Sequence, residues 1–164
     1  MFFNNPKHVA RAYYCLFFAA LGAILPYLGI YYLQINLATY QIGILAALLT
    51  AISLVASPFW SFIADRFQLH QKLLPALILM TIPTMLLIGR TQEFEKLIIL
   101  ITLFAGCLAP INPMADYAVL KMLGERKKEY GRLRLWGSIG FAIVALLVGS
   151  VIEVVGLEAC FAVF

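Results

Sequence analysis

Residues 116–141 read DYAVLKMLGERKKEYGRLRLWGSIGF and join two apolar segments through a strongly basic turn. Asp116 lies six residues before the end of the first apolar segment, and Arg132 and Arg134 open the second. Charged side chains inside a membrane are costly, so they normally face a partner or a water-filled cavity. The stretch therefore predicts two neighbouring membrane helices that carry a polar site, as in membrane transport proteins.

The composition of the chain is that of an integral membrane protein. Hydrophobic residues make up 63% of the 164 residues and charged residues only 12%, and the mean hydropathy is +0.95. A soluble domain usually has about twice this charged fraction. The net charge of +4 does not indicate nucleic-acid binding, because the basic residues follow the expected membrane topology.

The apolar segments predict an all-α membrane protein with five complete transmembrane helices and the start of a sixth. At about 20 residues per span, a chain of this length can hold five or six spans. The predicted spans are residues 12–33, 42–64, 73–89, 97–122 and 135–155, followed by a partial span at 159–164. Because six residues cannot cross a membrane, we expect residues 1–164 to be one transmembrane bundle of a longer protein.

Prolines predict bends inside these segments. Pro26 should kink the first span, which is tolerated in a helix packed among helices. Pro113 removes the usual partner of the carbonyl near Ala109, so the fourth span should bend there. The short third span contains Pro75 and Pro83 and should be among the most kinked or the least tilted.

The basic residues predict the orientation of the chain. With a cytoplasmic N-terminus, ten of the twelve lysines and arginines lie on the inner side, and only Arg90 and Lys96 lie outside. The ten inner residues are Lys7, Arg11, Arg66, Lys72, Lys121, Arg126, Lys127, Lys128, Arg132 and Arg134. This asymmetry follows the positive-inside rule. We therefore predict a protein of the cytoplasmic (inner) membrane, surrounded by the lipid bilayer, with its N-terminus in the cytoplasm.

The candidate polar site combines Asp116, Asn112 and Arg134. Asn112 and Asp116 are four residues apart and share one face of a helix. At ~1.5 Å per residue, Asp116 lies about 9 Å up its helix and Arg134 starts about 5 Å up the next one. The long arginine side chain can make up the difference. The simpler alternative is that Arg134 is a snorkelling anchor at the membrane surface, which Asp116 merely neutralises.

Two stretches resemble the major facilitator superfamily. Residues 61–68, SFIADRFQ, resemble its motif G-x-x-x-D-R-x-G between the second and third helices, with Ser61 and Gln68 in place of the glycines. The resemblance implies that Asp65 and Arg66 form a conformational gating motif, since a carboxylate at a helix end can meet the positive N-terminus of a neighbouring helix.

Residues 130–141, YGRLRLWGSIGF, are similar to the segment that enters the fifth helix in the lactose permease, nucleoside and phenylpropionate proton symporter branch. Residues 22–27 and 44–66 also look like that branch, so the resemblance covers nearly the whole chain. By position, the lactose permease resemblance implies substrate-binding roles for Asp116, for Arg134 as its partner, and for Phe141 as a stacking residue where the lactose permease has a tryptophan. It also implies twelve helices in two halves with the substrate between them, so this chain corresponds to the N-terminal half.

Three classes of function follow from these observations. The leading hypothesis is a secondary active transporter, a proton symporter for a small organic solute such as a sugar, a nucleoside or an aromatic acid. The alternative is a half-size membrane protein that acts as a dimer or as an assembly partner. An enzyme is not predicted, because the spans contain no Ser/His, Asp/Asp or HExxH constellation. No cofactor, metal or nucleic-acid partner is predicted either, and the three cysteines lack metal-ligand spacing.

Overall fold

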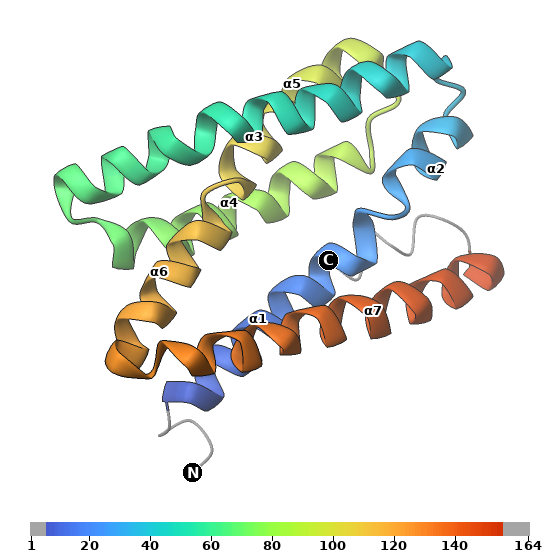
Figure 1. Ribbon diagram of the computed structural model, residues 1–164. Helices are drawn as coiled ribbons and strands as arrows, with labels where there is room; N and C mark the ends of the chain where they lie inside the picture. Colours follow the sequence, from blue (N-terminus) through green and yellow to red (C-terminus); the bar gives the residue numbers. More distant parts are fainter. Residues whose placement is uncertain (1–5, 156–164) are drawn as a thin grey trace. The chain divides into compact units, whose positions relative to one another are not determined.

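The computed structural model describes residues 6–155, which are helical almost throughout (Figure 1). In chain order the helices are α1 (Pro6–Ile24), α2 (Leu28–Gln34), α3 (Thr39–Phe67), α4 (His70–Ile88), α5 (Phe94–Leu108), α6 (Ile111–Leu123), the 3₁₀ helix η2 (Gly124–Glu129) and α7 (Tyr130–Val155). The all-α prediction is confirmed for these residues. The partial helix predicted at residues 159–164 lies outside the described residues.

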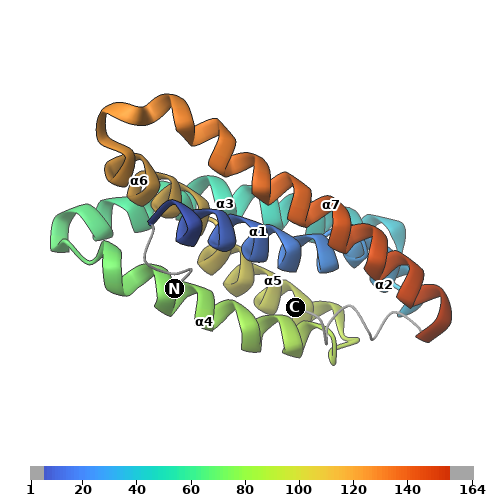
Figure 2. The ribbon, with the colours of Figure 1, turned by 90° about the horizontal axis from the view of Figure 1, so that it is seen from below.

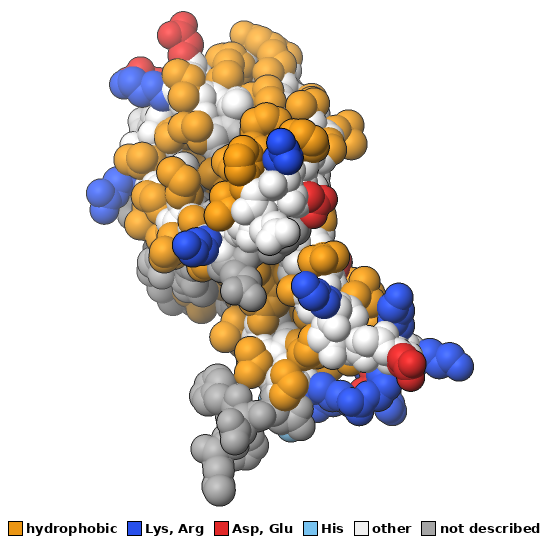
Figure 3. Space-filling view, turned by 90° about the vertical axis from the view of Figure 1, so that its left-hand side faces the viewer, with side chains coloured by type: hydrophobic (Ala, Val, Ile, Leu, Met, Phe, Trp, Pro, Cys, Tyr) orange, Lys and Arg blue, Asp and Glu red, His pale blue; other side chains and the backbone are white. Residues whose placement is uncertain are grey.

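Long apolar helices support the assignment to a membrane protein. Three helical stretches, Pro6–Gln34, Thr39–Phe67 and Phe94–Ile152, are long and apolar enough to cross a bilayer, and Lys72–Ile88 is a shorter apolar helix. Figure 3 shows apolar side chains over much of this face, with lysine and arginine side chains among them and several gathered near its lower end. The number of crossings, five with a partial sixth, stays a prediction.

Prolines interrupt the helices at two of the expected places. The chain turns at Pro26 between α1 and α2, where the proline has no N–H to donate to the Gly22 carbonyl. It breaks again between α5 and α6, where Pro110 and Pro113 leave the carbonyls of Gly106 and Ala109 without their usual donors. Both bends are therefore confirmed.

The third segment is one continuous helix, and its predicted kink or low tilt stays a prediction. Helix α4 contains Pro75 and Pro83 but runs from His70 to Ile88 without interruption. A single missing N–H can be tolerated in an apolar helix because the remaining backbone groups still need their intrahelical partners. The breaks of the chain lie at Pro26 and Pro110 instead.

The helices form two compact units, residues 1–31 with 118–164 and residues 32–117. In the first unit α1 and α7 lie side by side along most of their length (Figures 1 and 2). In the second unit α5 packs against both α3 and α4. Helix α6 crosses the boundary between the units, so its first residues belong to the second unit and its last to the first.

Helices α1 and α7 run parallel. Near their N-terminal ends the Lys7 ammonium contacts the Glu129 carboxylate at 2.5 Å. Just beyond the C-terminal end of α1, the Tyr27 hydroxyl donates a hydrogen bond to the Ala145 carbonyl in the second half of α7. From the first contact to the second, the residue number rises on both helices. The two helices therefore point in the same direction.

Glycines bring the backbones of α1 and α7 into direct contact. A Cβ at Gly140 would overlap the carbonyl oxygen of Cys15, and a Cβ at Gly22 would lie 2.6 Å from the carbonyl oxygen of Phe141. A Cβ at Gly137 would lie 2.7 Å from the ring of Phe18. Small residues at such contacts are the usual means by which membrane helices approach closely.

The turn between α3 and α4 is closed by a residue in the left-handed conformation. Gln68 has φ 52° and ψ 36°, and its N–H bonds to the Ala64 carbonyl. The N–H of Leu69 bonds to the same carbonyl. Helix ends of this kind favour glycine, because a Cβ is unfavourable in this conformation. A glycine, which the motif that residues 61–68 resemble has at this position, would adopt this conformation without strain.

We predict that Gly140→Ala destabilises the protein by about 1–3 kcal/mol, the usual cost of overpacking a tight contact. The new methyl group would meet backbone atoms of Cys15, which cannot rotate aside as a side chain can. Gly131→Ala is the matched control on α7, because a Cβ there meets nothing within 4 Å. The free energy of unfolding in detergent micelles measures the effect, and equal stability of the two variants would contradict the close contact.

We predict that Gln68→Gly stabilises the protein by about 0.5–1 kcal/mol, since glycine adopts the left-handed conformation without a steric penalty. The control is Ala47→Gly, inside α3 and exposed, which should destabilise by about 1 kcal/mol. Thermal unfolding in detergent compares the two variants. A Gln68→Gly protein that loses as much stability as Ala47→Gly would refute the role of the left-handed turn.

Candidate functional site

Arg134 lies on an aromatic surface of α1. It is half-buried near the start of α7, and its guanidinium carbon is 4.5 Å from the centre of the Phe18 ring and 5.7 Å from that of Tyr14. A guanidinium over an aromatic face is stabilised by about 0.5–2 kcal/mol, more where water is excluded. These rings hold the cation in place within the first unit.

Four aromatic residues of α1 build this surface. Tyr13 stacks on Phe17 with ring centres 5.7 Å apart, and Tyr14 lies 6.5 Å from Phe18. Phe17 and Phe18 meet edge to face at 5.6 Å. The sequence analysis did not identify Tyr14 and Phe18 as site residues, although the paired aromatics at a spacing of four would have placed them on a common helix surface.

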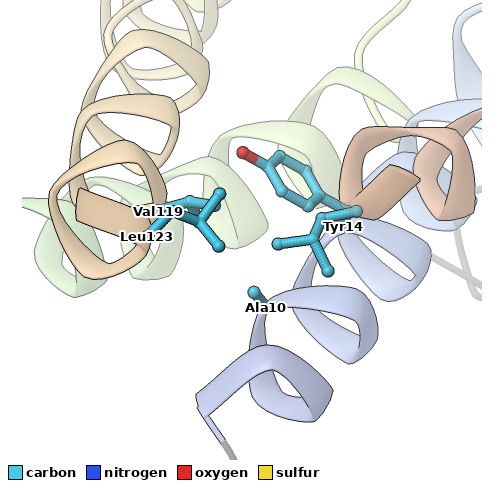
Figure 4. Close-up of a cluster of buried hydrophobic side chains, with 5 residues drawn as sticks. Ala10, Tyr14, Val119 and Leu123 are labelled. Atoms are coloured by element: carbon cyan, nitrogen blue, oxygen red, sulfur yellow. The ribbon is translucent and has the colours of Figure 1, made fainter. Parts of the chain in front are cut away.

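A buried cluster fixes the position of Tyr14. The cluster contains Ala10, Tyr14, Val119, Leu123 and Leu133, and Tyr14 is completely buried in it. In Figure 4 the Tyr14 ring lies beside the side chains of Val119 and Leu123. The end of α6 and the beginning of α7 therefore hold the aromatic residue on which Arg134 rests.

An ion pair between Lys7 and Glu129 joins the start of α1 to the end of η2, just before α7. The hydrogen bond from Lys7 is the main reason that the pKa of the Glu129 carboxyl lies below its ordinary value. The positive charges of Lys7, Arg126 and Arg132 lower this pKa further, and partial burial opposes them. Glu129 therefore stays ionised to a lower pH in the folded protein than in the unfolded chain, and the stabilisation by this pair is lost only as the pH falls through the lowered pKa.

Asn112 and Asp116 lie four residues apart on α6, as predicted, and both are half-buried. The side-chain oxygen Oδ1 of Asn112 is buried and has no hydrogen-bond partner among the described residues. A buried acceptor without a partner costs about 1–3 kcal/mol. This oxygen is therefore ready to accept a hydrogen bond from a donor that the described residues do not supply.

The remaining predicted site residues lie apart from this pair in the sequence. Phe141 is half-buried on α7, with its backbone against Gly22, whereas Asp65 and Arg66 are exposed at the end of α3. Asp116 belongs to the second unit and Arg134 to the first. The pairing of Asp116 with Arg134 therefore stays a prediction.

Comparison with known proteins shows similarity to transporters. The model of the MFS_1 like family matches residues 9–164. The chain is 28% identical over 159 residues to a maltose permease of Geobacillus stearothermophilus, an alignment that covers 96% of the chain and 40% of that protein. It is 27% identical over 156 residues to an Escherichia coli protein named as a probable 3-phenylpropionic acid transporter, covering 93% and 40%. With the multidrug resistance protein MdtG of Salmonella arizonae it shares 28% identity over 150 residues, covering 87% and 37%.

The chain spans about 40% of the length of these curated relatives. No solved structure matches it. The family model, in contrast, covers nearly the whole chain, and the structure of the described residues is all-helical with long apolar helices. The chain therefore belongs to the MFS_1 like family of the major facilitator superfamily.

Proposed function

We propose that this chain is the N-terminal half of a secondary active transporter that couples the movement of a small organic solute to protons. Membership of the superfamily supports transport, and the relatives are named as permeases and transporters. Their printed names include a sugar, maltose, and an aromatic acid, 3-phenylpropionic acid, which supports these two classes of solute. The similarity of residues 130–141 to the lactose permease, nucleoside and phenylpropionate branch supports proton symport.

The observation that carries the solute site is the polar face of α6. Asn112 and Asp116 are half-buried on an apolar helix, and the Asn112 oxygen lacks a partner among the described residues. Polar groups at such places in membrane proteins normally face a binding site or a water-filled path. In the proposed transporter, Asp116 and Asn112 accept hydrogen bonds from the solute.

Three further roles complete the proposal. Arg134 binds the solute from α7, where Phe18 and Tyr14 hold its guanidinium. Phe141 offers an aromatic face to the solute. Asp65 and Arg66 serve as the gating motif at the exposed end of α3. The protein acts in the inner membrane with its N-terminus in the cytoplasm.

We predict that Asp116→Asn raises the KM for solute uptake roughly 10–100-fold, the effect of losing a charged hydrogen bond of about 1.5–3 kcal/mol. Uptake by the complete transporter in proteoliposomes is measured over sugars, nucleosides and aromatic acids, and the best solute is used. Glu125→Gln is the control, because Glu125 is exposed on η2, and its KM should not change.

The double variant Asp116→Asn/Arg134→Gln separates binding from charge compensation. If Asp116 only neutralises Arg134, removing both charges restores uptake to near the original level, and the binding role is refuted. The 164-residue chain alone should give no saturable uptake, because alternating access needs two bundles around one site. Saturable uptake by this chain alone would instead favour the half-size alternative.

A further inference from the structure

Among the described side chains of the first unit, two arginines make no ion pair with a carboxylate. Arg134 makes contacts with aromatic rings, and no ion pair to it occurs among the described residues of its unit. The Nε atom of Arg11 is buried and has no hydrogen-bond partner there. Both side chains are half-buried. A guanidinium that is removed from water without a partner loses the strong hydrogen bonds that a charged group makes.

The sequence of α1 places Arg11 on the seam, by which we mean the contact surface between α1 and the segment formed by η2 and α7. Lys7, Arg11, Tyr14 and Phe18 follow one another at spacings of four, three and four, so they form one stripe along the helix. The contacts at the two ends of this stripe go to consecutive parts of the chain, from Lys7 to Glu129 at the end of η2 and from Phe18 to Arg134 near the start of α7. Arg11 therefore lies on the side of α1 that faces α7, one turn before the ring of Tyr14.

The described acidic side chains of the first unit do not pair with these arginines. The acidic side chains that the structure describes in this unit are Glu125 and Glu129. Glu129 is bound by Lys7, and Glu125 is exposed on η2. Within the described part of the unit, the seam therefore carries positive charge at Arg11 and Arg134 that no carboxylate of its own balances.

The contact of Arg134 with the rings leaves its donors usable. Stacking occupies the flat face of a guanidinium, whereas its five N–H groups point outward in the plane. These groups match the two oxygens of a carboxylate in a bidentate pair. The aromatic rings thus hold the cation in one position without using the atoms that would bind an anion.

We propose that Arg11 and Arg134 bind the carboxylate of an organic anion, which makes the solute of the proposed transporter a monocarboxylate. Only the claim that the anion is the transported solute rests on the proposed function. Anion binding at this seam can be measured without transport. Arg11 becomes a binding residue, and the apolar part of the anion meets the aromatic surface of α1.

Binding to the complete protein in nanodiscs of phosphatidylcholine, a lipid without net charge, tests this. Isothermal titration compares benzoate and hexanoate with benzamide and hexanamide. We expect at least one carboxylate to bind at least 10-fold more tightly than its amide. Arg11→Gln and Arg134→Gln should each weaken carboxylate binding at least 10-fold and leave amide binding nearly unchanged. No preference for either carboxylate over its amide would overturn the proposal.

Arg132→Gln is the matched control, because Arg132 is exposed two residues from Arg134 on the same helix. An equal loss in this variant would show general attraction by positive charge and would overturn the site. If either glutamine variant fails to fold, Arg11→Lys and Arg134→Lys replace them. They keep the charge but lose the bidentate geometry, and they should still weaken carboxylate binding several-fold.

Two further measurements complete the test. The first distinguishes a solute from a lipid headgroup as the bound anion, and the second separates failure of this inference from failure of the proposed transport function. Nanodiscs of phosphatidylglycerol that abolish carboxylate binding in an arginine-dependent manner would show that a lipid headgroup occupies the seam, which overturns a solute site. Carboxylate binding without uptake of any solute would keep the anion site and refute transport. Uptake of neutral solutes without carboxylate binding would keep transport and refute this inference.

Discussion

The direct contact between the backbones of α1 and α7 is the constraint on which the first unit depends. In a bilayer, lipid tails are as apolar as leucine, so helices associate through close packing and hydrogen bonds rather than through the hydrophobic effect. Glycines on both helices remove the side chains that would separate them. The ion pair of Lys7 with Glu129 and the hydrogen bond of Tyr27 to Ala145 then tie the two ends of the seam.

This contact also gives Arg134 its surroundings. Because Gly137 allows the ring of Phe18 to lie against α7, the guanidinium one turn earlier reaches the face of the same ring. Tyr14, buried against the end of α6 and the beginning of α7, lies against the same guanidinium. A cation that would be costly in lipid is thereby stabilised by aromatic faces while its N–H groups stay available.

The architecture was largely predictable because it follows from composition and local chemistry. Long apolar segments require helices in a membrane, and Pro26 and Pro113 act on their own helix backbones. The continuity of α4 was not predictable, since Pro75 and Pro83 look the same in sequence as the prolines at the two breaks. The left-handed conformation of Gln68 was not predicted for a similar reason, because a glutamine in the sequence does not indicate a turn that favours glycine.

The site was less predictable than the fold. The shared face of Asn112 and Asp116 follows from helical periodicity alone. The aromatic support of Arg134 depends on α1 and α7 being neighbours, although more than a hundred residues separate Tyr14 from Arg134 in the sequence, and no local pattern reports that pairing. The unsatisfied Nε of Arg11 likewise becomes visible only once the seam is assembled. The count of basic residues on each side of the membrane treats Arg11 and Arg134 alike, as basic residues near the inner surface.

Disulfide formation between α1 and α7 in native membranes tests the parallel seam most directly. In a protein whose own cysteines are replaced by serine, Lys7→Cys/Glu129→Cys should cross-link readily under mild oxidation, because these side chains touch. Lys7→Cys/Gly149→Cys should not, because Gly149 lies beside Tyr27 at the other end of the seam. Efficient cross-linking of the second pair and none of the first would contradict the parallel packing and, with it, the placement of Arg134 on the rings of α1.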